Sequence, residues 1–181
     1  MIKVCGVLPF KESACRISID QYVPITFRSY AEPINVQRIR AGTSNGSMFE
    51  LLVGGEGNVV RGFTLTIFDT AHDVIPSHMV PVMFGLPKIE TIPDLAFEGP
   101  PYALRADLKK RVTFGLNNDC AEVLFSEHRD FDEVVRCARV SFLLRQQALI
   151  GVRVFELSTA EYDALVGFVS RLPGCGLPGA Y

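Results

Sequence analysis

Two stretches of the chain alternate hydrophobic and polar residues on both sides of a short turn. In residues 47–69 the turn is the glycine-rich segment 54–57, and in residues 138–156 it is the segment 145–148. A period of two residues is typical of a strand, and glycine supplies the positive φ that a tight reversal needs. No phosphate-binding glycine motif is completed here. Both stretches therefore predict β-hairpins.

The hydrophobic period changes after residue 156. Ser158 and Glu161 have the spacing of a capping box, in which each side chain accepts a hydrogen bond from the other residue's backbone amide. Hydrophobic residues then recur at helical spacing, at Tyr162, Leu165, Val166 and Val169. The segment predicts a helix of about three turns.

Shorter alternating segments predict further strands near residues 3–8, 16–28, 79–84, 111–116 and 121–125. The Pro-rich connection 85–110 is interpreted as a long crossing segment, and a β duplication about it is a further hypothesis because one hairpin lies on each side. The fold class predicted is α+β, a single domain over residues 1–172. Its sheet is mostly antiparallel and built from hairpins, with the C-terminal helix packed on one face. Residues 173–181 are expected to form a flexible tail.

Charge and hydropathy exclude several classes of function. The 181 residues include 18 basic and 20 acidic side chains, so no excess of positive charge favours direct binding to nucleic acid. No uninterrupted hydrophobic run reaches the 18 to 20 residues of a membrane helix, and the N-terminus has no signal-peptide pattern. We expect a soluble cytoplasmic protein that does not bind membranes.

The cysteines are scattered, without a C-x-x-C pair or a histidine at metal-ligand spacing. They are Cys5, Cys15, Cys120, Cys137 and Cys175. We interpret them as buried or unreactive thiols of a reducing cytosol.

Candidate chemistry is sparse. His72 lies between Asp69 and Asp73, so a general base oriented by a carboxylate is one hypothesis. A solvated histidine in a polar loop is the more common case. His78 and His128 show no ligand spacing. No catalytic residue, metal ligand or cofactor is therefore assigned from the sequence.

An acidic group occupies the loop before the last hairpin. It consists of Glu127, Asp130, Asp132 and Glu133, with Arg129 and Arg136 interspersed. A solvated connection is the usual meaning of such a loop. The functional hypothesis is that these four carboxylates bind a partner with a basic surface, because complementary charge speeds encounter and sets orientation.

Three segments together resemble a known class of proteins: "FELLVGGEGNVVRGFTLTIF", "RVTFGLNNDCAEVLFS" and "VSFLLRQQALIGVRVFELSTAEYDAL". The arrangement is similar to small bacterial immunity proteins encoded beside contact-dependent growth inhibition and other polymorphic toxins. In those proteins a hairpin leads into a Leu-Ser-x-x-Glu helix start, which Leu157, Ser158 and Glu161 match here. The resemblance spans residues 48–165. It implies an antitoxin that binds and neutralises the C-terminal domain of a cognate toxin by protein binding, without catalysis.

Two alternatives stay open. A curved sheet could enclose a small ligand among some of the 13 phenylalanines, although phenylalanines at inward-facing strand positions more commonly form the core. A hydrolase centred on His72 is the less favoured alternative. The sequence specifies no oligomeric state.

Overall fold

The computed structural model describes residues 1–9, 15–29, 36–43, 47–54, 57–76, 79–90 and 105–172. Within these ranges the strands form two hydrogen-bonded layers. The first layer consists, in spatial order, of β2 (Cys15–Ser18), β3 (Ile25–Ser29), β6 (Val59–Ile67), β5 (Met48–Gly54), β4 (Val36–Gly42) and β10 (Arg105–Lys109). The second layer consists of β7 (Thr70–His72), β11 (Thr113–Leu116), β12 (Cys120–Leu124), β15 (Ala148–Phe155), β14 (Val140–Arg145), β13 (Glu133–Cys137) and β8 (Val82–Phe84).

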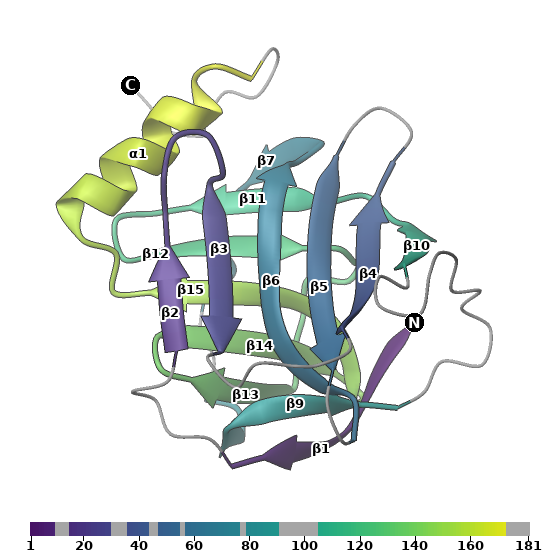
Figure 1. The fold of residues 1–181 in the computed structure, drawn as a ribbon. Coiled ribbons are helices and arrows are strands. Elements are labelled where there is room, and N and C mark those ends of the chain that lie inside the picture. Colours follow the sequence, from purple (N-terminus) through teal and green to yellow (C-terminus); the bar gives the residue numbers. More distant parts are fainter. Residues whose placement is uncertain are drawn as a thin grey trace.

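The strands of the two layers cross at a steep angle, with β3, β6 and β5 running down the view of Figure 1 and β11, β12 and β15 running across it. Strand β1 (Ile2–Leu8) joins the layers. Its first residues pair with β15, through Ile2 and Leu149, and its later residues pair with β9 (Leu86–Ile89). The register shifts between Val4 and Gly6. Strands that change sheets through a bulge form the corners of orthogonal β sandwiches.

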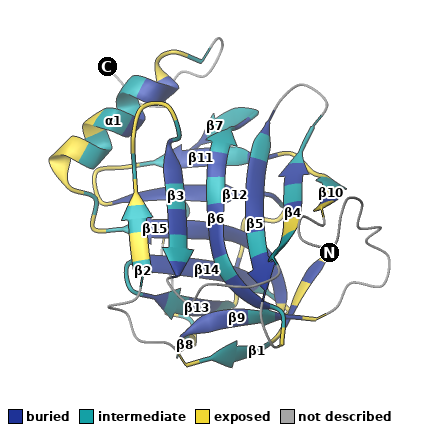
Figure 2. Ribbon diagram, in the orientation of Figure 1, coloured by how far each residue is buried: buried dark blue, intermediate teal, exposed yellow. Residues whose placement is uncertain are grey.

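Phenylalanine rings fill the space between the layers. Phe49 of β5 stacks on Phe125 with ring centroids 4.9 Å apart, and Phe63 of β6 meets Phe142 of β14 edge-on at 6.3 Å. Phe27, Phe49, Phe63 and Phe142 are at most 1% exposed. These phenylalanines are therefore core residues, and Figure 2 shows the buried positions running along both layers.

Both predicted hairpins are confirmed, as β5–β6 and β14–β15. The second hairpin reverses through Gln146 and Gln147, whose φ angles are 50° and 65°. Two successive residues with positive φ are the signature of a type I′ turn, whose twist matches that of the flanking strands. In the first hairpin, residues 55 and 56 lie outside the described residues, and Gly57 and Asn58 have φ angles of 77° and 49°.

The structure corrects the predicted strand pattern in several places. Strands β4, β7 and β13 lie in segments for which no strand was predicted. The segment 16–28 forms two strands, because the Asp20 carboxylate accepts hydrogen bonds from the Tyr22 and Val23 amides and turns the chain between β2 and β3. The connection 85–110 contains β9 and β10, which both belong to the sheets. Residues 91–104 and the predicted tail 173–181 lie outside the described residues.

The sheet is mixed, which the hairpin pattern did not predict. Parallel pairing joins β10 to β4, β7 to β11 and β8 to β13. Each of these short strands lies at the edge of a layer and pairs with a strand distant in sequence. The two confirmed hairpins lie in different layers, and the duplication hypothesis stays a prediction.

The single described helix, α1 (Thr159–Val169), begins with the predicted capping box. Leu165, Phe168 and Val169 are buried and belong to the core between the layers. The Phe168 ring lies 6.0 Å from that of Phe68. The helix therefore contributes to the core at one end of the sandwich (Figure 1). Among the described residues no helix has the length and apolar character needed to cross a membrane.

Glu161 links the start of the helix to the β13–β14 turn. Its carboxylate accepts hydrogen bonds from the Ser158 amide at 2.9 Å and from the Arg139 guanidinium, one of them at 2.9 Å. The Arg139 hydrogen bond is the main cause that lowers the pKa of Glu161 to about 2, from an ordinary value of 4.5. One side chain thus caps the helix and ties it to the second layer.

Replacing Glu161 with alanine removes both roles. We expect the free energy of unfolding at pH 7 to fall by about 1–3 kcal/mol in urea denaturation. Thr159→Ala, at the exposed first residue of the helix, is the control and should change it by less than about 0.5 kcal/mol. The pKa of Glu161 is lower in the folded state than in the unfolded chain. The contribution of its carboxylate to the free energy of unfolding is therefore present above pH 4.5 and is lost as the pH falls toward 2. If Glu161→Ala lowers the free energy of unfolding by the same amount at pH 3 and at pH 7, this account is wrong.

Candidate functional site

A row of polar positions crosses the second layer on one face. Directly paired residues of neighbouring strands point to the same side of a sheet. The register places the following residues in one such row: Arg136, Ser141, Arg153, Glu122, Gly115 and His72. Three of these side chains are charged or titratable and are almost fully buried, which makes this row the first candidate for a functional site.

Arg153 and Glu122 form an ion pair at the centre of the row. Arg153 is 1% exposed and Glu122 is 0% exposed. The Arg153 Nε donates to Glu122 Oε2 at 2.9 Å, and Arg153 Nη2 donates to the same oxygen. The guanidinium also lies 5.3 Å from the ring centroid of Phe131, within cation–π range. The pair is neutral overall, which lowers the cost of burying its two charges.

The same pair holds the chain segment that follows β7. Arg153 Nη2 donates to the Ile75 carbonyl at 2.7 Å, and the Ile75 amide donates to Glu122 Oε1 at 3.3 Å. Ile75 also packs with a second hydrophobic cluster on this face, formed by Leu124, Phe131, Val134, Leu143 and Ile150. The ion pair therefore fixes a covering segment over the outer face of the second layer.

His72 lies at the end of the row, above Gly115. A Cβ built on Gly115 would come within 2.8 Å of the imidazole Cε1, so the glycine provides the space for the ring. His72 Nδ1 donates to the Asp73 carbonyl at 2.7 Å and lies 3.9 Å from Glu122 Oε1. Burial is the largest effect on this side chain and lowers the pKa of His72 below its ordinary value of 6.5. Its buried Nε2 has no hydrogen-bond partner among the described residues.

The hypothesis that the carboxylate of Asp69 or Asp73 orients His72 as a base is wrong, because neither carboxylate is hydrogen-bonded to the imidazole. The Asp69 carboxylate accepts hydrogen bonds from Thr43 Oγ1 at 2.9 Å and from the Val112 amide at 2.8 Å. Asp73 is exposed and offers His72 only its backbone carbonyl. The interpretation of His72 as a solvated loop residue is also wrong, since the residue is 5% exposed. His78 lies outside the described residues.

The sequence contained a signal for this cluster that an analysis of hydrophobic periodicity does not consider, namely lone charged residues within hydrophobic strands. Glu122 and Arg153 are single charged residues of opposite sign within the hydrophobic strand segments "CAEVLF" and "IGVRVF". A lone charge in such a strand is rarely fully buried unless it is paired. The three side chains of the cluster are at most 5% exposed, so a substrate in solvent does not reach them in this conformation.

Breaking the ion pair should be costly. We expect Glu122→Ala and Arg153→Met each to lower the free energy of unfolding by about 3–5 kcal/mol, because each leaves an uncompensated buried charge or unpaired acceptor. The double variant should be less destabilised than the sum of the two, by an interaction energy of about 1–3 kcal/mol. Urea denaturation of the four proteins measures this double-mutant cycle. Additive effects would show that the pair does not act as a unit.

The buried imidazole should make stability depend on pH. Because burial lowers the folded-state pKa of His72, the unfolded chain binds its proton more readily, and stability decreases as the pH falls below 6.5. We expect His72→Gln to flatten this decrease in urea denaturation between pH 8 and pH 5.5. His128→Gln, at an exposed histidine, is the control and should retain the wild-type dependence. If the stability of His72→Gln depends on pH as steeply as that of the wild-type protein, His72 is not the cause of the decrease.

A surface pocket of about 350 Å³ lies beside the acidic loop. Its floor is hydrophobic and includes Ile2, Phe125, Leu149 and Ile150. Its rim carries charged and titratable residues, namely Lys110, Glu127, His128 and Arg145. The pocket thus combines a hydrophobic floor with a rim of polar groups, which is the usual composition of a recognition site.

The structure separates the four acidic residues predicted to bind a partner. Glu127 is exposed and lines the pocket. Asp130 pairs with Arg145 Nε at 3.2 Å, and the Asp132 carboxylate accepts from the Gln146 amide at 3.0 Å. Glu133 lies within β13, opposite Leu144. Asp130 and Asp132 therefore connect the loop to the β14–β15 turn, and Glu127 is the carboxylate placed at the pocket.

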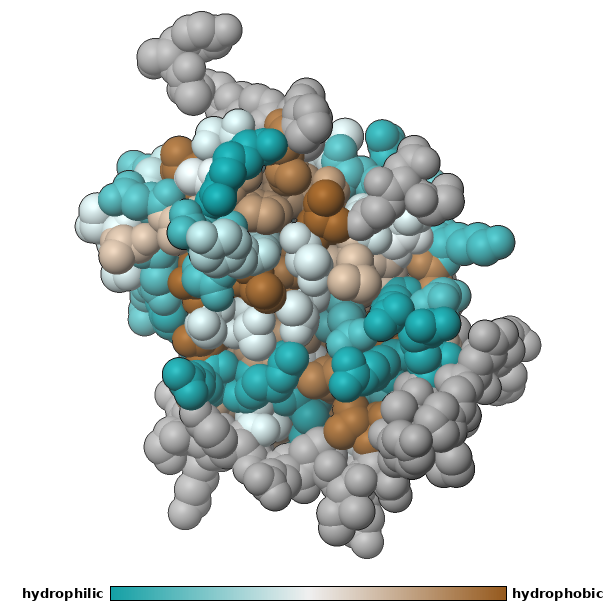
Figure 3. All heavy atoms as spheres, turned by 45° about the horizontal axis from the view of Figure 1, so that its top comes forward, coloured by the Kyte–Doolittle hydropathy of each residue, from teal (hydrophilic) through white to brown (hydrophobic). Residues whose placement is uncertain are grey.

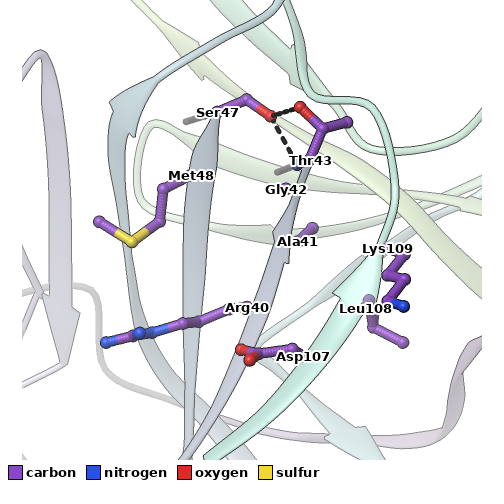
Figure 4. Close-up of a pocket in the computed structure, with 9 residues that line it drawn as sticks. All are labelled: Arg40, Ala41, Gly42, Thr43, Ser47, Met48, Asp107, Leu108 and Lys109. Atoms are coloured by element: carbon purple, nitrogen blue, oxygen red, sulfur yellow. Dashed lines mark hydrogen bonds between the residues drawn. The ribbon is translucent and has the colours of Figure 1, made fainter. Parts of the chain in front are cut away.

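A larger open pocket of about 650 Å³ lies between β4 and β10. Ser47 and Thr43 border it, with the Thr43 amide donating to Ser47 Oγ at 2.9 Å. In Figure 4 the side chains of Arg40 and Lys109 extend away from each other, so the two cations do not converge on one point. Arg40 Nε instead pairs with Glu50 at 3.1 Å. The arrangement does not form a focused anion site.

Hydrophobic residues on the face shown in Figure 3 occur in several small groups separated by polar residues. Within the described residues, no group of three or more histidine, cysteine, aspartate or glutamate side chains could hold a metal ion. The chain matches no protein-family model and no curated protein.

Proposed function

We propose that this protein is an immunity protein that binds a cognate bacterial toxin domain in the cytoplasm and neutralises it without catalysis. The resemblance of its strand, turn and helix-start segments to such proteins is one support. The observation that carries the proposal is the pocket beside the acidic loop, because its hydrophobic floor and charged rim match the anatomy of a protein-binding hot spot.

The floor of the pocket belongs to the rigid part of the fold. Leu149 and Ile150 lie in β15, which pairs with β12, β14 and β1. Phe125 follows β12, and its amide donates to the Ile150 carbonyl at 3.0 Å. A floor held by central strands is ordered before binding, so little conformational entropy is lost when a hydrophobic toxin side chain enters it.

The rim supplies specificity. Glu127 is the exposed carboxylate of the rim and would pair with a lysine or arginine of the toxin beside its hydrophobic anchor. Asp130 and Asp132 hold the loop against Arg145 and Gln146 and so maintain the shape of the rim. Neutralisation then requires that the bound protein cover or distort the toxin's active site, a task for a complementary surface.

Co-expression in bacteria tests the proposal. The toxin is the C-terminal domain of the protein encoded immediately upstream, expressed with and without this protein. We expect growth arrest that this protein relieves, and a Glu127→Arg variant that binds the toxin at least tenfold more weakly because a like charge replaces the carboxylate at the rim. Asp163→Arg, at an exposed acidic residue of α1, is the matched control and should protect fully.

Two results would count against the proposal. If the upstream domain is toxic and this protein neither binds it nor restores growth, the immunity function is wrong. If protection is intact and Glu127→Arg binds as tightly as Asp163→Arg, the pocket is not the interface. A metabolite that raises the thermal stability of the protein would instead favour the alternative of small-ligand binding.

A further inference from the structure

Two cysteines that are distant in the sequence meet where the edge strand of the first layer lies beside the end of β13 in the second. Cys15 begins β2 in the first layer, and Cys137 ends β13 in the second. Their sulfur atoms lie 2.9 Å apart, although 122 positions separate them in the chain. This contact is independent of the proposed function, because the recognition pocket lies near the opposite end of β13, where Asp132 contacts the β14–β15 turn.

We propose that Cys15 and Cys137 form a redox-dependent disulfide that joins the two layers. Non-bonded heavy atoms settle at roughly 3.5–4.0 Å, and the sulfurs of a disulfide are about 2.05 Å apart. At 2.9 Å the two sulfurs are already inside non-bonded contact, so bond formation needs a movement of under about 1 Å. The fold therefore presents the pair in an arrangement close to that of the bond.

An oxidant can reach this pair from one side. Cys15 is partly exposed and lines an open pocket of about 460 Å³, together with Arg136, Arg139 and Glu156. Cys137 lies behind it and is 1% exposed. The thiolate is the nucleophile in disulfide exchange, and of the two sulfurs that of Cys15 is the one at the pocket surface. Cys15 is accordingly the attacking residue and Cys137 the resolving residue.

The reaction requires an oxidant of the disulfide class, for which oxidised glutathione is the probe. The Cys15 thiolate attacks one sulfur of the oxidant, which forms a mixed disulfide and releases the other half as a thiolate. Cys137 then gives its proton to the thiolate released in the first step and attacks the Cys15 sulfur, which breaks the mixed disulfide and releases the second half of the oxidant as a thiolate. Two protein thiols are oxidised to one disulfide, and one oxidant disulfide is reduced to two thiols.

The cross-link should make stability depend on redox state. A disulfide between residues 15 and 137 closes a long loop and so removes many conformations from the unfolded chain. It also fixes β2, an edge strand that pairs with β3, to the second layer. We expect oxidation to raise the Tm by about 5–15 °C and reduction to reverse the change.

The test uses the full chain, reduced and then equilibrated with mixtures of reduced and oxidised glutathione. Remaining thiols are alkylated, and disulfide-linked peptides are mapped by mass spectrometry beside a thermal scan. We expect a peptide that links Cys15 to Cys137, and a Tm that rises with oxidation in wild type and in Cys5→Ser, where an exposed thiol is removed. In Cys15→Ser the Tm should not respond to the oxidant.

Three results would overturn the proposal: no linked peptide in the most oxidising mixture, a linkage between other cysteines, or only glutathione attached to Cys15. The peptide map of the wild-type protein decides this even if Cys15→Ser folds poorly. Cys120 serves as an internal reference, since burial raises the pKa of its thiol to about 11 and it should resist oxidation in the folded protein.

Discussion

The ion pair between Arg153 and Glu122 determines how the second layer can be buried on both faces. The strands β12, β14 and β15 are hydrophobic on the side that faces the first layer and are also covered on the other side. The pair neutralises the two charges in the middle of this outer face and fixes the segment around Ile75 over it. Without this pairing, the segment would lose its attachment and the second hydrophobic cluster would lose part of its cover.

Burial on two faces also explains the hydrophobic character of these strands. Strand β3 of the first layer shows the alternation expected of a strand with one solvated face, because its buried and half-buried residues alternate. The central strands of the second layer are buried at almost every position. Its buried polar residues, His72, Glu122, Ser141 and Arg153, are consequently few and lie in one row, in which Gly115 provides the space for the His72 ring.

The residues that form the core and the residues of the proposed recognition pocket lie in different parts of the molecule. The charge cluster and the phenylalanine core lie inside, whereas the proposed recognition pocket lies where the loop after β12 meets the β14–β15 turn. The thiol pair lies toward the other end of β13, beside the turn that carries Arg139. A cross-link there would strengthen the contact between the layers at a distance from the pocket, so oxidation and partner binding can vary independently.

The sequence by itself determined the local elements whose cause is local: the two hairpins, the capping box of Ser158 and Glu161, and the hydrophobic faces of their strands. Backbone preferences and short-range hydrogen bonds decide these, and both can be read from neighbouring residues. Tertiary structure alone decided the parallel edge strands, the partners of His72, the division of the acidic residues and the meeting of Cys15 with Cys137. Each of these depends on which distant segments become neighbours, and that is set by how two crossed layers bury their hydrophobic faces together, a property that periodicity along one segment does not contain.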